Sequence, residues 1–179
     1  MAQYWKLPYY ATAGMSDSKI PDAQAGYEKA LTALTTALAG ANYIHDAAGL
    51  LNFTMTASYE QYVIDNEIIG MVGRILSGIE TDREHLAVEA IREVGPGGNY
   101  MSHEHTLKFM RSEFYTPRVS DRNRFELWKE KGSLDARQRA NRIAREILDR
   151  DAKNFLSSEA IKAAMSRFGP ALDPRVTGS

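Results

Sequence analysis

The sequence places one histidine where a catalytic or binding group is expected. His45 ends the short segment 42–45, which follows a predicted helix and is rich in residues that favour strands. Site residues of parallel α/β proteins lie at the carboxyl ends of the strands, and an imidazole there can donate a proton or bind a carboxylate. We therefore take His45 as a candidate catalytic residue. A purely structural histidine is the alternative.

Three other ionisable side chains could bind a metal ion or an organic cation. His103 and His105 could suggest a metal site, but residues two apart on a helix point to different sides, so we expect no metal there. Glu67 lies beside the apolar stripe of a long predicted helix, where it could pair with Arg74 or counter a bound cation. The alternative for Glu67 is a solvated carboxylate on the flank of the helix.

The composition narrows the classes of partner. The 179 residues are 44% hydrophobic and 25% charged with a net charge of -1, which indicates one globular domain without a field that attracts nucleic acid or anionic lipid. The absence of cysteine excludes thiolate nucleophiles and Cys-based metal sites. We find no secretory signal and no run of about 18 apolar residues. We expect a cytoplasmic protein that binds neither nucleic acid nor membranes.

The amino-terminal elements follow the order strand, helix, strand. A strand is predicted around Tyr9–Thr12, and a second strand over 42–45. Between them a helix begins after Asp22, whose carboxylate can cap it, and ends near Gly40. Four apolar residues share one face of this helix: Tyr27, Leu31, Leu34 and Leu38.

The rest of the chain is predicted to be mainly helical. A long helix covers 58–79, and its apolar stripe consists of Ile64, Ile68, Met71, Val72, Ile75 and Ile79. Further helices are predicted from the Thr81/Glu84 capping box to Gly95, over 102–114, from Ser120 or Asp121 to Trp128 (with Gly132 as the stop), over 136–147, and from Ser157 or Ser158 to Phe168, before a loose tail at 173–179. We expect a helix-rich α/β fold with two or three short parallel strands. So few strands leave unpaired sheet edges, so the chain resembles part of a larger protein.

Three stretches resemble the trimethylamine methyltransferase family, and together they cover nearly the whole chain. The first runs over 16–28 and leads into 39–44, and the second covers 58–68 with its Glu-Gln and Asp-x-Glu-Ile spacings. The third and most specific consists of Gly97-Gly98-Asn99-Tyr100, His105-Thr106, Pro117, Asp121-Arg122 and Trp128.

The resemblance implies both a fold and an activity. It implies that residues 1–179 form about the last third of a TIM-type (β/α) barrel, with the site at the carboxyl ends of the strands. The implied enzyme moves a methyl group from a small methylated amine to the Co(I) of a corrinoid (cobalamin) carried by a separate corrinoid protein. The segment itself would bind no cofactor and would be inactive alone, and a homo-oligomer is expected. Only standard residues are present, which favours the members without pyrrolysine, similar to glycine betaine methyltransferases. The alternative is that the pyrrolysine position lies outside residues 1–179.

The resemblance also implies how the candidate substrate-binding residues would bind a methylated amine. Aromatic faces suit a quaternary ammonium, at about 0.5 to 2 kcal/mol per contact, and Tyr43 and Tyr100 are the best placed rings. His105 belongs to the matching block and Glu67 could counter the cation. Ordinary core or turn packing is the alternative for both tyrosines. Two other functions stay open, namely a non-catalytic module that binds quaternary ammonium or a partner through its helices, and a structural helical domain.

Overall fold

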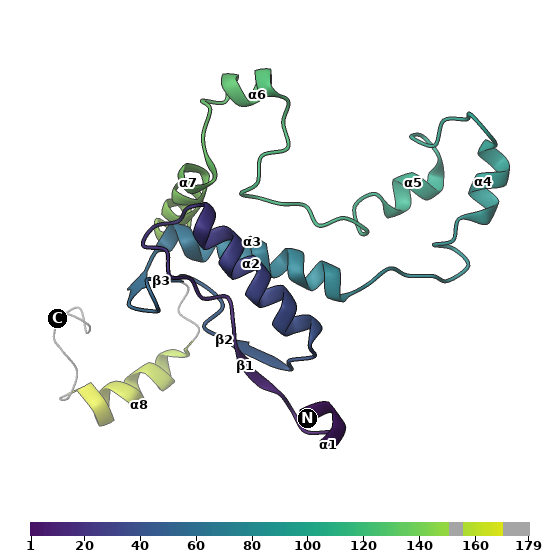
Figure 1. The fold of residues 1–179 in the computed structure, drawn as a ribbon. Helices are drawn as coiled ribbons and strands as arrows, with labels where there is room; N and C mark the ends of the chain where they lie inside the picture. Colours follow the sequence, from purple (N-terminus) through teal and green to yellow (C-terminus); the bar gives the residue numbers. More distant parts are fainter. Residues whose placement is uncertain (151–155, 170–179) are drawn as a thin grey trace. The chain divides into compact units, whose positions relative to one another are not determined.

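The computed structural model describes residues 1–150 and 156–169, and these form a helix-rich α/β structure with a few short strands (Figure 1). The predicted tail at 173–179 lies outside the described residues. No helix in the described part is both long and apolar enough to cross a membrane. In chain order the elements are α1 (Ala2–Trp5), β1 (Tyr10–Thr12), α2 (Ala23–Leu38), β2 (Tyr43–His45), β3 (Leu50–Leu51), β4 (Thr56–Ala57), α3 (Tyr59–Leu76), α4 (Val88–Val94), α5 (Glu104–Phe109), α6 (Phe125–Glu130), α7 (Ala136–Leu148) and α8 (Ser158–Phe168).

Two parallel strands joined by a helix confirm the predicted strand–helix–strand order. β1 pairs with β2 in parallel (Figure 1). In this register Tyr10 lies opposite Tyr43, and Thr12 lies opposite His45. The remaining two strands, β3 and β4, form an antiparallel hairpin of two-residue strands. The expectation of parallel strands alone was therefore wrong for this hairpin, which is too short to give an alternating pattern in the sequence.

Helix α2 begins and ends as predicted, but it buries a different face. The Asp22 carboxylate accepts a hydrogen bond from the Ala25 amide at 3.0 Å, and Gly40 adopts a φ of +88° just after the helix. The predicted apolar face is largely exposed, with Tyr27, Leu31 and Leu38 between 56% and 60% accessible. The buried positions are instead Ala25, Lys29, Ala33 and Ala37. Small side chains let the backbone of α2 approach its neighbours closely.

Helix α3 begins where the sequence predicts, and it is capped by Ser58, whose hydroxyl accepts from the Gln61 amide at 3.3 Å. The helix ends at Leu76, so that Ile79 lies beyond it and is 86% exposed. The predicted apolar stripe is at most half-buried, and its last helical member, Ile75, is exposed. The three buried residues of α3 are Gln61, Asp65 and Glu67. Polar side chains therefore occupy the contact between α3 and its surroundings.

A buried ion pair joins α2 to α3. The Lys29 ammonium lies 3.0 Å from the Asp65 carboxylate, and both side chains are 1% exposed. Lys29 also donates to the carbonyl of Gly14, while Asp65 accepts from the Gly49 amide at 2.7 Å and from the Gln61 side chain at 2.7 Å. Burial raises the pKa of the Asp65 carboxyl against the opposing effects of Lys29 and these hydrogen bonds. Because ionised Asp65 is costly to bury, the pair acts through geometric specificity more than through net stability.

The same two charged residues hold the loops that follow both parallel strands. Gly14 comes two residues after β1, and Gly49 comes four residues after β2. Gly14 has a φ of +77°, and a Cβ there would lie 2.9 Å from the Cα of Ala47. The loops at the carboxyl ends of β1 and β2 are therefore packed against one another and tied to the helices behind them.

Glu67 is buried, so the alternative of a solvated carboxylate on the helix flank was wrong, and its partners are backbone amides. Its side chain is 5% exposed and accepts hydrogen bonds from the amides of residues 118, 119 and 120, at 2.6, 2.5 and 2.9 Å, and from the Ser120 hydroxyl. Burial raises the pKa of the Glu67 carboxyl, but the hydrogen bonds outweigh burial and place the pKa below its ordinary value. The expected pairing with Arg74 was wrong, because Arg74 binds Glu113 at 2.9 Å. Glu67 thus anchors a distant loop.

The helices after α3 are shorter than predicted. The Thr81/Glu84 capping box does not start a helix, because the Asp82 carboxylate accepts from the amides of Glu84 and His85 and forms a turn instead. Helix α4 begins only at Val88, and α5 covers six residues of the predicted 102–114. Helix α6 starts at Phe125 because Ser120 is engaged by Glu67 and Asp121 by Asn123.

The last two helices agree with the sequence prediction. Helix α7 covers the predicted range 136–147 and buries Ala140 and Ala144. Helix α8 is capped by Ser157, whose hydroxyl accepts from the Ala160 amide at 3.2 Å. The chain divides into two compact units, Met1–Glu146 and Ile147–Ser179.

Removing one partner of the buried ion pair should destabilise the protein strongly. Asp65→Asn leaves the Lys29 charge buried without its counterion, so we expect the free energy of unfolding in urea to fall by about 3–5 kcal/mol. The double variant with Lys29→Met should lose less than Asp65→Asn alone, since it leaves no unpaired buried charge. Losses that simply add in the double variant would show that the two residues are not coupled.

The loop anchor at Glu67 should make stability depend on pH. A carboxyl whose pKa is lowered by folding stabilises the protein above the unfolded pKa, about 4.3 for Glu, and this contribution is lost as pH falls through the folded pKa. Glu67→Gln should cost about 2 kcal/mol at neutral pH and progressively less in acid. The measurement is the free energy of unfolding against pH, with exposed Glu126→Gln on α6 as the control. An equal cost at all pH values would contradict the assignment of ionised Glu67.

Candidate functional site

One face of the parallel strand pair carries rings and hydroxyls and is largely bare. Because side chains alternate along a strand, Tyr10 and Thr12 of β1 share this face with Tyr43 and His45 of β2. The two tyrosines are 61% and 62% exposed, whereas Ala11 on the opposite face is buried. We call the side of Tyr10, Thr12, Tyr43 and His45 the ring face. It spans both strands, with Tyr10 and Tyr43 at their first residues and Thr12 and His45 at their last residues.

The rings on this face are stacked nearly parallel. The Tyr10 ring stacks on Tyr43 with centroids 5.4 Å apart, and on His45 with centroids 4.5 Å apart, both at an interplanar angle of 7°. Stacking on Tyr10 covers one face of the Tyr43 ring and leaves the other for a ligand. Cations bind over ring faces, so the free face of Tyr43 is where this strand pair can receive one.

Hydrogen bonds fix the orientation of the His45 imidazole. Its Nδ1 lies 3.0 Å from the carbonyl oxygen of Ala11, and because a carbonyl only accepts, Nδ1 carries the hydrogen. Its Nε2 lies 2.7 Å from the Thr12 hydroxyl and 3.3 Å from the Asp46 carboxylate. Neutral Nε2 can accept from Thr12, and a proton on Nε2 would face the negative charge of Asp46. The imidazole can therefore hold or release a proton at Nε2.

Asp46 was missed by the sequence reasoning. It follows directly after β2 and adopts a φ of +59°, a left-handed conformation that is uncommon outside glycine. Such strained positions are enriched at functional sites. An acidic residue directly after a strand that ends in His is the signal that could have identified it.

Two other residues predicted to bind substrate, Tyr100 and His105, make their contacts outside the ring face. Tyr100 is 40% exposed in the segment before α5. His105 lies on α5, where its Nε2 is 2.8 Å from the Glu84 carbonyl and its ring packs on Phe109. Within the described residues, no hydrogen bond, ion pair or ring contact joins either of them to the ring face. Their role in binding substrate stays a prediction, as does that of Tyr43 and His45.

Two further histidines are engaged by carboxylates. His85 is half-buried, with Nδ1 2.7 Å from the Asp82 carboxylate, Nε2 3.6 Å from the Glu113 carboxylate, and its ring against Phe109. His103 lies 3.1 Å from Glu93. Across the described ranges, no group of three or more His, Asp or Glu side chains is arranged to hold a metal ion.

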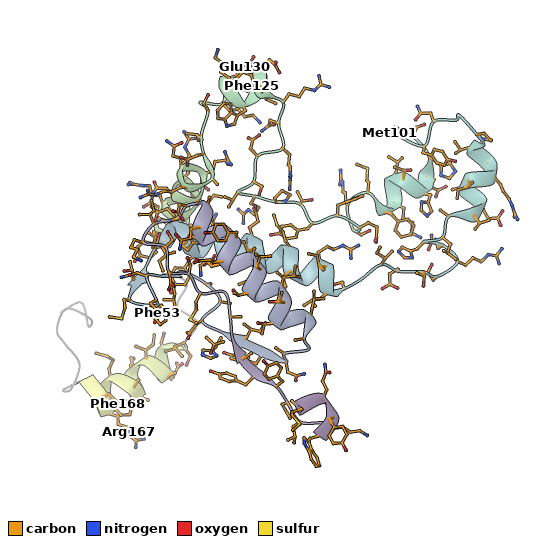
Figure 2. The ribbon with its side chains drawn as sticks, in the orientation of Figure 1. Phe53, Met101, Phe125, Glu130, Arg167 and Phe168 are labelled. Carbon is orange, nitrogen blue, oxygen red and sulfur yellow. The ribbon has the colours of Figure 1, made fainter. Side chains whose placement is uncertain are left out.

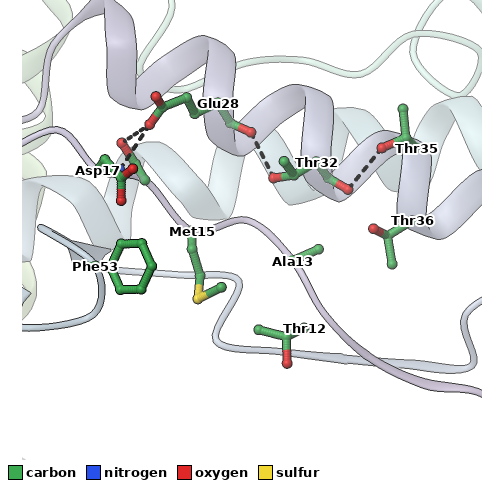
Figure 3. A pocket seen from close by; sticks show the side chains of 10 residues that line it. Thr12, Ala13, Met15, Asp17, Glu28, Thr32, Thr35, Thr36 and Phe53 are labelled. Carbon is green, nitrogen blue, oxygen red and sulfur yellow. Dashed lines mark hydrogen bonds between the residues drawn. The ribbon is translucent and has the colours of Figure 1, made fainter.

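A cleft of about 380 Å³ opens between α2 and the loop after β1 (Figure 3). Its carboxylate Glu28 accepts from the Ser16 hydroxyl at 2.7 Å and from the Asp17 amide at 3.0 Å. Thr12 belongs both to this cleft and to the ring face. The sequence reasoning missed the cleft, although the hydroxyls on one side of α2 recur at helical spacing. Met15, Phe53, Thr32, Thr35 and Thr36 also line this cleft.

Phe53 borders this cleft from a strained turn. Asn52, Phe53 and Thr54 all have positive φ values, of 49°, 55° and 67°, at the tip of the β3–β4 hairpin (Figure 2). Each left-handed residue costs about 1–2 kcal/mol. Hydrogen bonds from the amides of Asn52 and Phe53 to the carbonyls of Ser18 and Ser16 hold the turn in place. The ring of Phe53 stays 76% exposed.

Comparisons with known proteins identify the relatives of this chain. A glycine betaine methyltransferase of Desulfitobacterium hafniense (strain Y51) is 37% identical over 176 residues, which cover 98% of this chain and 33% of the relative. A trimethylamine methyltransferase of Desulfitobacterium hafniense (strain DSM 10664 / DCB-2) is 44% identical over 149 residues, covering 83% of this chain and 30% of the relative. One from Methanosarcina barkeri is 40% identical over 167 residues, covering 90% and 33%.

The chain therefore spans about a third of the length of the curated relatives it matches. The family model for trimethylamine methyltransferase matches residues 1–169, which include both parallel strands, the ring face and the loop anchored by Glu67. The chain belongs to the trimethylamine methyltransferase family.

Proposed function

We propose that this chain is part of a methyltransferase that moves a methyl group from a small quaternary or tertiary methylated amine to a corrinoid protein. The observation that carries the proposal is the ring face, where an exposed tyrosine ring and an oriented imidazole lie together in a chain of this family. The names of its relatives include glycine betaine and trimethylamine methyltransferases, which supports a methylated amine as the donor.

We further propose that the chain forms the carboxyl-terminal part of a TIM-type barrel. β1, α2, β2 and α3 follow one another as two strand–helix units, interrupted only by the β3–β4 hairpin. In the described part of the chain, β1 and β2 pair only with each other, so each has an open edge. A TIM barrel has eight strands, and a chain that spans a third of its relatives would leave the others to the rest of the protein. The ring face would then face the barrel interior.

The ring face can perform the binding step. The ammonium group of the donor would rest on the free face of Tyr43, which excludes water from one side of the cation. From a quaternary ammonium the amine departs as a neutral molecule, so no proton donor is needed. A tertiary amine must first be protonated, because only then does it leave as a neutral secondary amine when its methyl group is transferred. The protonated Nε2 of His45, beside Asp46, can supply that proton.

The corrinoid of the partner protein, when bound, supplies the nucleophile that accepts the methyl group. The ring face suits such a reaction because it offers tyrosine, threonine and histidine side chains, and the sequence has no cysteine thiolate that would compete for the methyl group. The task left to this chain is to bind the donor, orient its methyl group and exclude water.

The proposed activity predicts methyl transfer by the full-length protein. With cobalamin held as Co(I), or with the cognate corrinoid protein, one donor from a panel of glycine betaine, trimethylamine, carnitine and proline betaine should change the cobalt absorbance. No transfer from any donor, combined with binding of one of them in calorimetry, would favour the non-catalytic binding module instead.

The role of His45 predicts a difference between donor classes. In the full-length protein, His45→Ala should lower kcat with a tertiary amine by about 100-fold, the lower end for a general acid, and should change kcat much less with a quaternary donor. Tyr27→Leu, an exposed ring on α2, serves as the control. Equal losses with both classes of donor would show that His45 supports the fold or the binding of donor and transfers no proton.

A further inference from the structure

A second cleft, of about 370 Å³, lies between the loop anchored by Glu67 and the start of α7. Four cationic side chains line it, and only one carboxylate accompanies them. We call it the basic cleft. The residues on which the argument rests are Arg118, Asp121, Trp128, Lys131, Arg139 and Arg142.

The protein neutralises the cations of the basic cleft only in part. Hydrogen bonds from Asn123, and to a smaller extent the charges of Arg139 and Lys131, lower the pKa of the Asp121 carboxyl, so this one carboxylate acts on two of the four cations. Asp121 accepts hydrogen bonds from the amide and side chain of Asn123, at 2.8 and 2.9 Å. Within the described part of the chain, none of the four cations forms an ion pair with a carboxylate, and the guanidinium groups of Arg118 and Arg142 have no hydrogen-bonding partner. Like charges held close together repel, so an anion bound among them would relieve that cost.

The cleft is built on a fixed frame. The Arg139 guanidinium donates to the carbonyls of Val119 and Leu134, which leaves one of its terminal nitrogens without an acceptor among the described residues. The indole of Trp128 donates to the same Leu134 carbonyl at 3.0 Å. The loop that carries Arg118 is held by three hydrogen bonds from its backbone amides to the Glu67 carboxylate. A site with preset donors binds at a lower entropic cost than a flexible surface.

We propose that the basic cleft binds a phosphate group. Guanidinium groups match tetrahedral oxyanions with paired hydrogen bonds, and several cations favour a dianion over a single carboxylate. The half-buried Trp128 ring forms an apolar wall that would accommodate the carbon atoms of a phosphate ester. The site is separate from the ring face and does not depend on the proposed methyl transfer.

Calorimetry on the full-length protein at constant ionic strength tests the proposal, with inorganic phosphate and glycerol phosphate as probes. We expect phosphate binding that weakens about tenfold or more in Arg142→Gln and in Lys131→Gln, because each loses a charge-assisted hydrogen bond. Arg137→Gln, on α7 but outside the basic cleft, should bind like the unmodified protein.

The two probes distinguish the source of the phosphate. Tighter binding of glycerol phosphate would identify an ester as the ligand, and equal binding would identify free phosphate. Absence of binding by both probes at millimolar concentrations would overturn the proposal. Unchanged affinity in both Arg142→Gln and Lys131→Gln would overturn it as well.

Discussion

The buried contact between Lys29 and Asp65 is the constraint on which the parallel strand pair depends. The ion pair joins Lys29 on α2 to Asp65 on α3. Each of the two groups also forms a hydrogen bond with the loop after a strand, Lys29 with the Gly14 carbonyl and Asp65 with the Gly49 amide. The loops after β1 and β2 are thereby held in register with α2 and α3. Because burying two charges is expensive, a shifted arrangement that left either one unpaired would be disfavoured by several kcal/mol. The contact therefore selects one arrangement of the ring face.

Carboxylates serve a second structural purpose in this chain, because they accept hydrogen bonds from backbone amides in loops that have no helix or strand partner for those amides. Glu67 organises the loop at 118–120 by accepting three consecutive amides, and Glu28 does the same on a smaller scale for the loop at 16–17. Their pKa values lie below the ordinary value for glutamate, so both act as anions near neutral pH. The loops bordering the strand ends and the basic cleft are positioned by charge more than by apolar packing.

The local elements could be predicted from the sequence because their signals are local. Asp22 caps the helix that it was expected to cap, and the helices predicted to start near Ser58 and Ser157 do start there. Strands form within the short segments at Tyr9–Thr12 and 42–45. These features depend on residues within one turn of each other. The parallel pairing also followed from the order of the elements.

The tertiary contacts could not be predicted in the same way. Lys29 was invisible as a core residue because a lysine is assigned to the surface unless its partner, 36 positions away, is known. The partners of Glu67 lie more than fifty residues further along the chain, so the sequence offered only the nearby Arg74, a bound cation or solvent as its partner. His45 and Tyr43 could be proposed from the sequence because they lie on a predicted strand, whereas Asp46 and Tyr10 become candidates only through the pairing of β1 with β2.

The most direct test of the central claim is an experimental structure of the full-length protein with its methylated amine bound. The account predicts that β1 and β2 are flanked by further parallel strands, and that the ammonium group lies over the free face of Tyr43 within reach of His45. A ring face packed against other side chains, with the amine bound elsewhere, would contradict it.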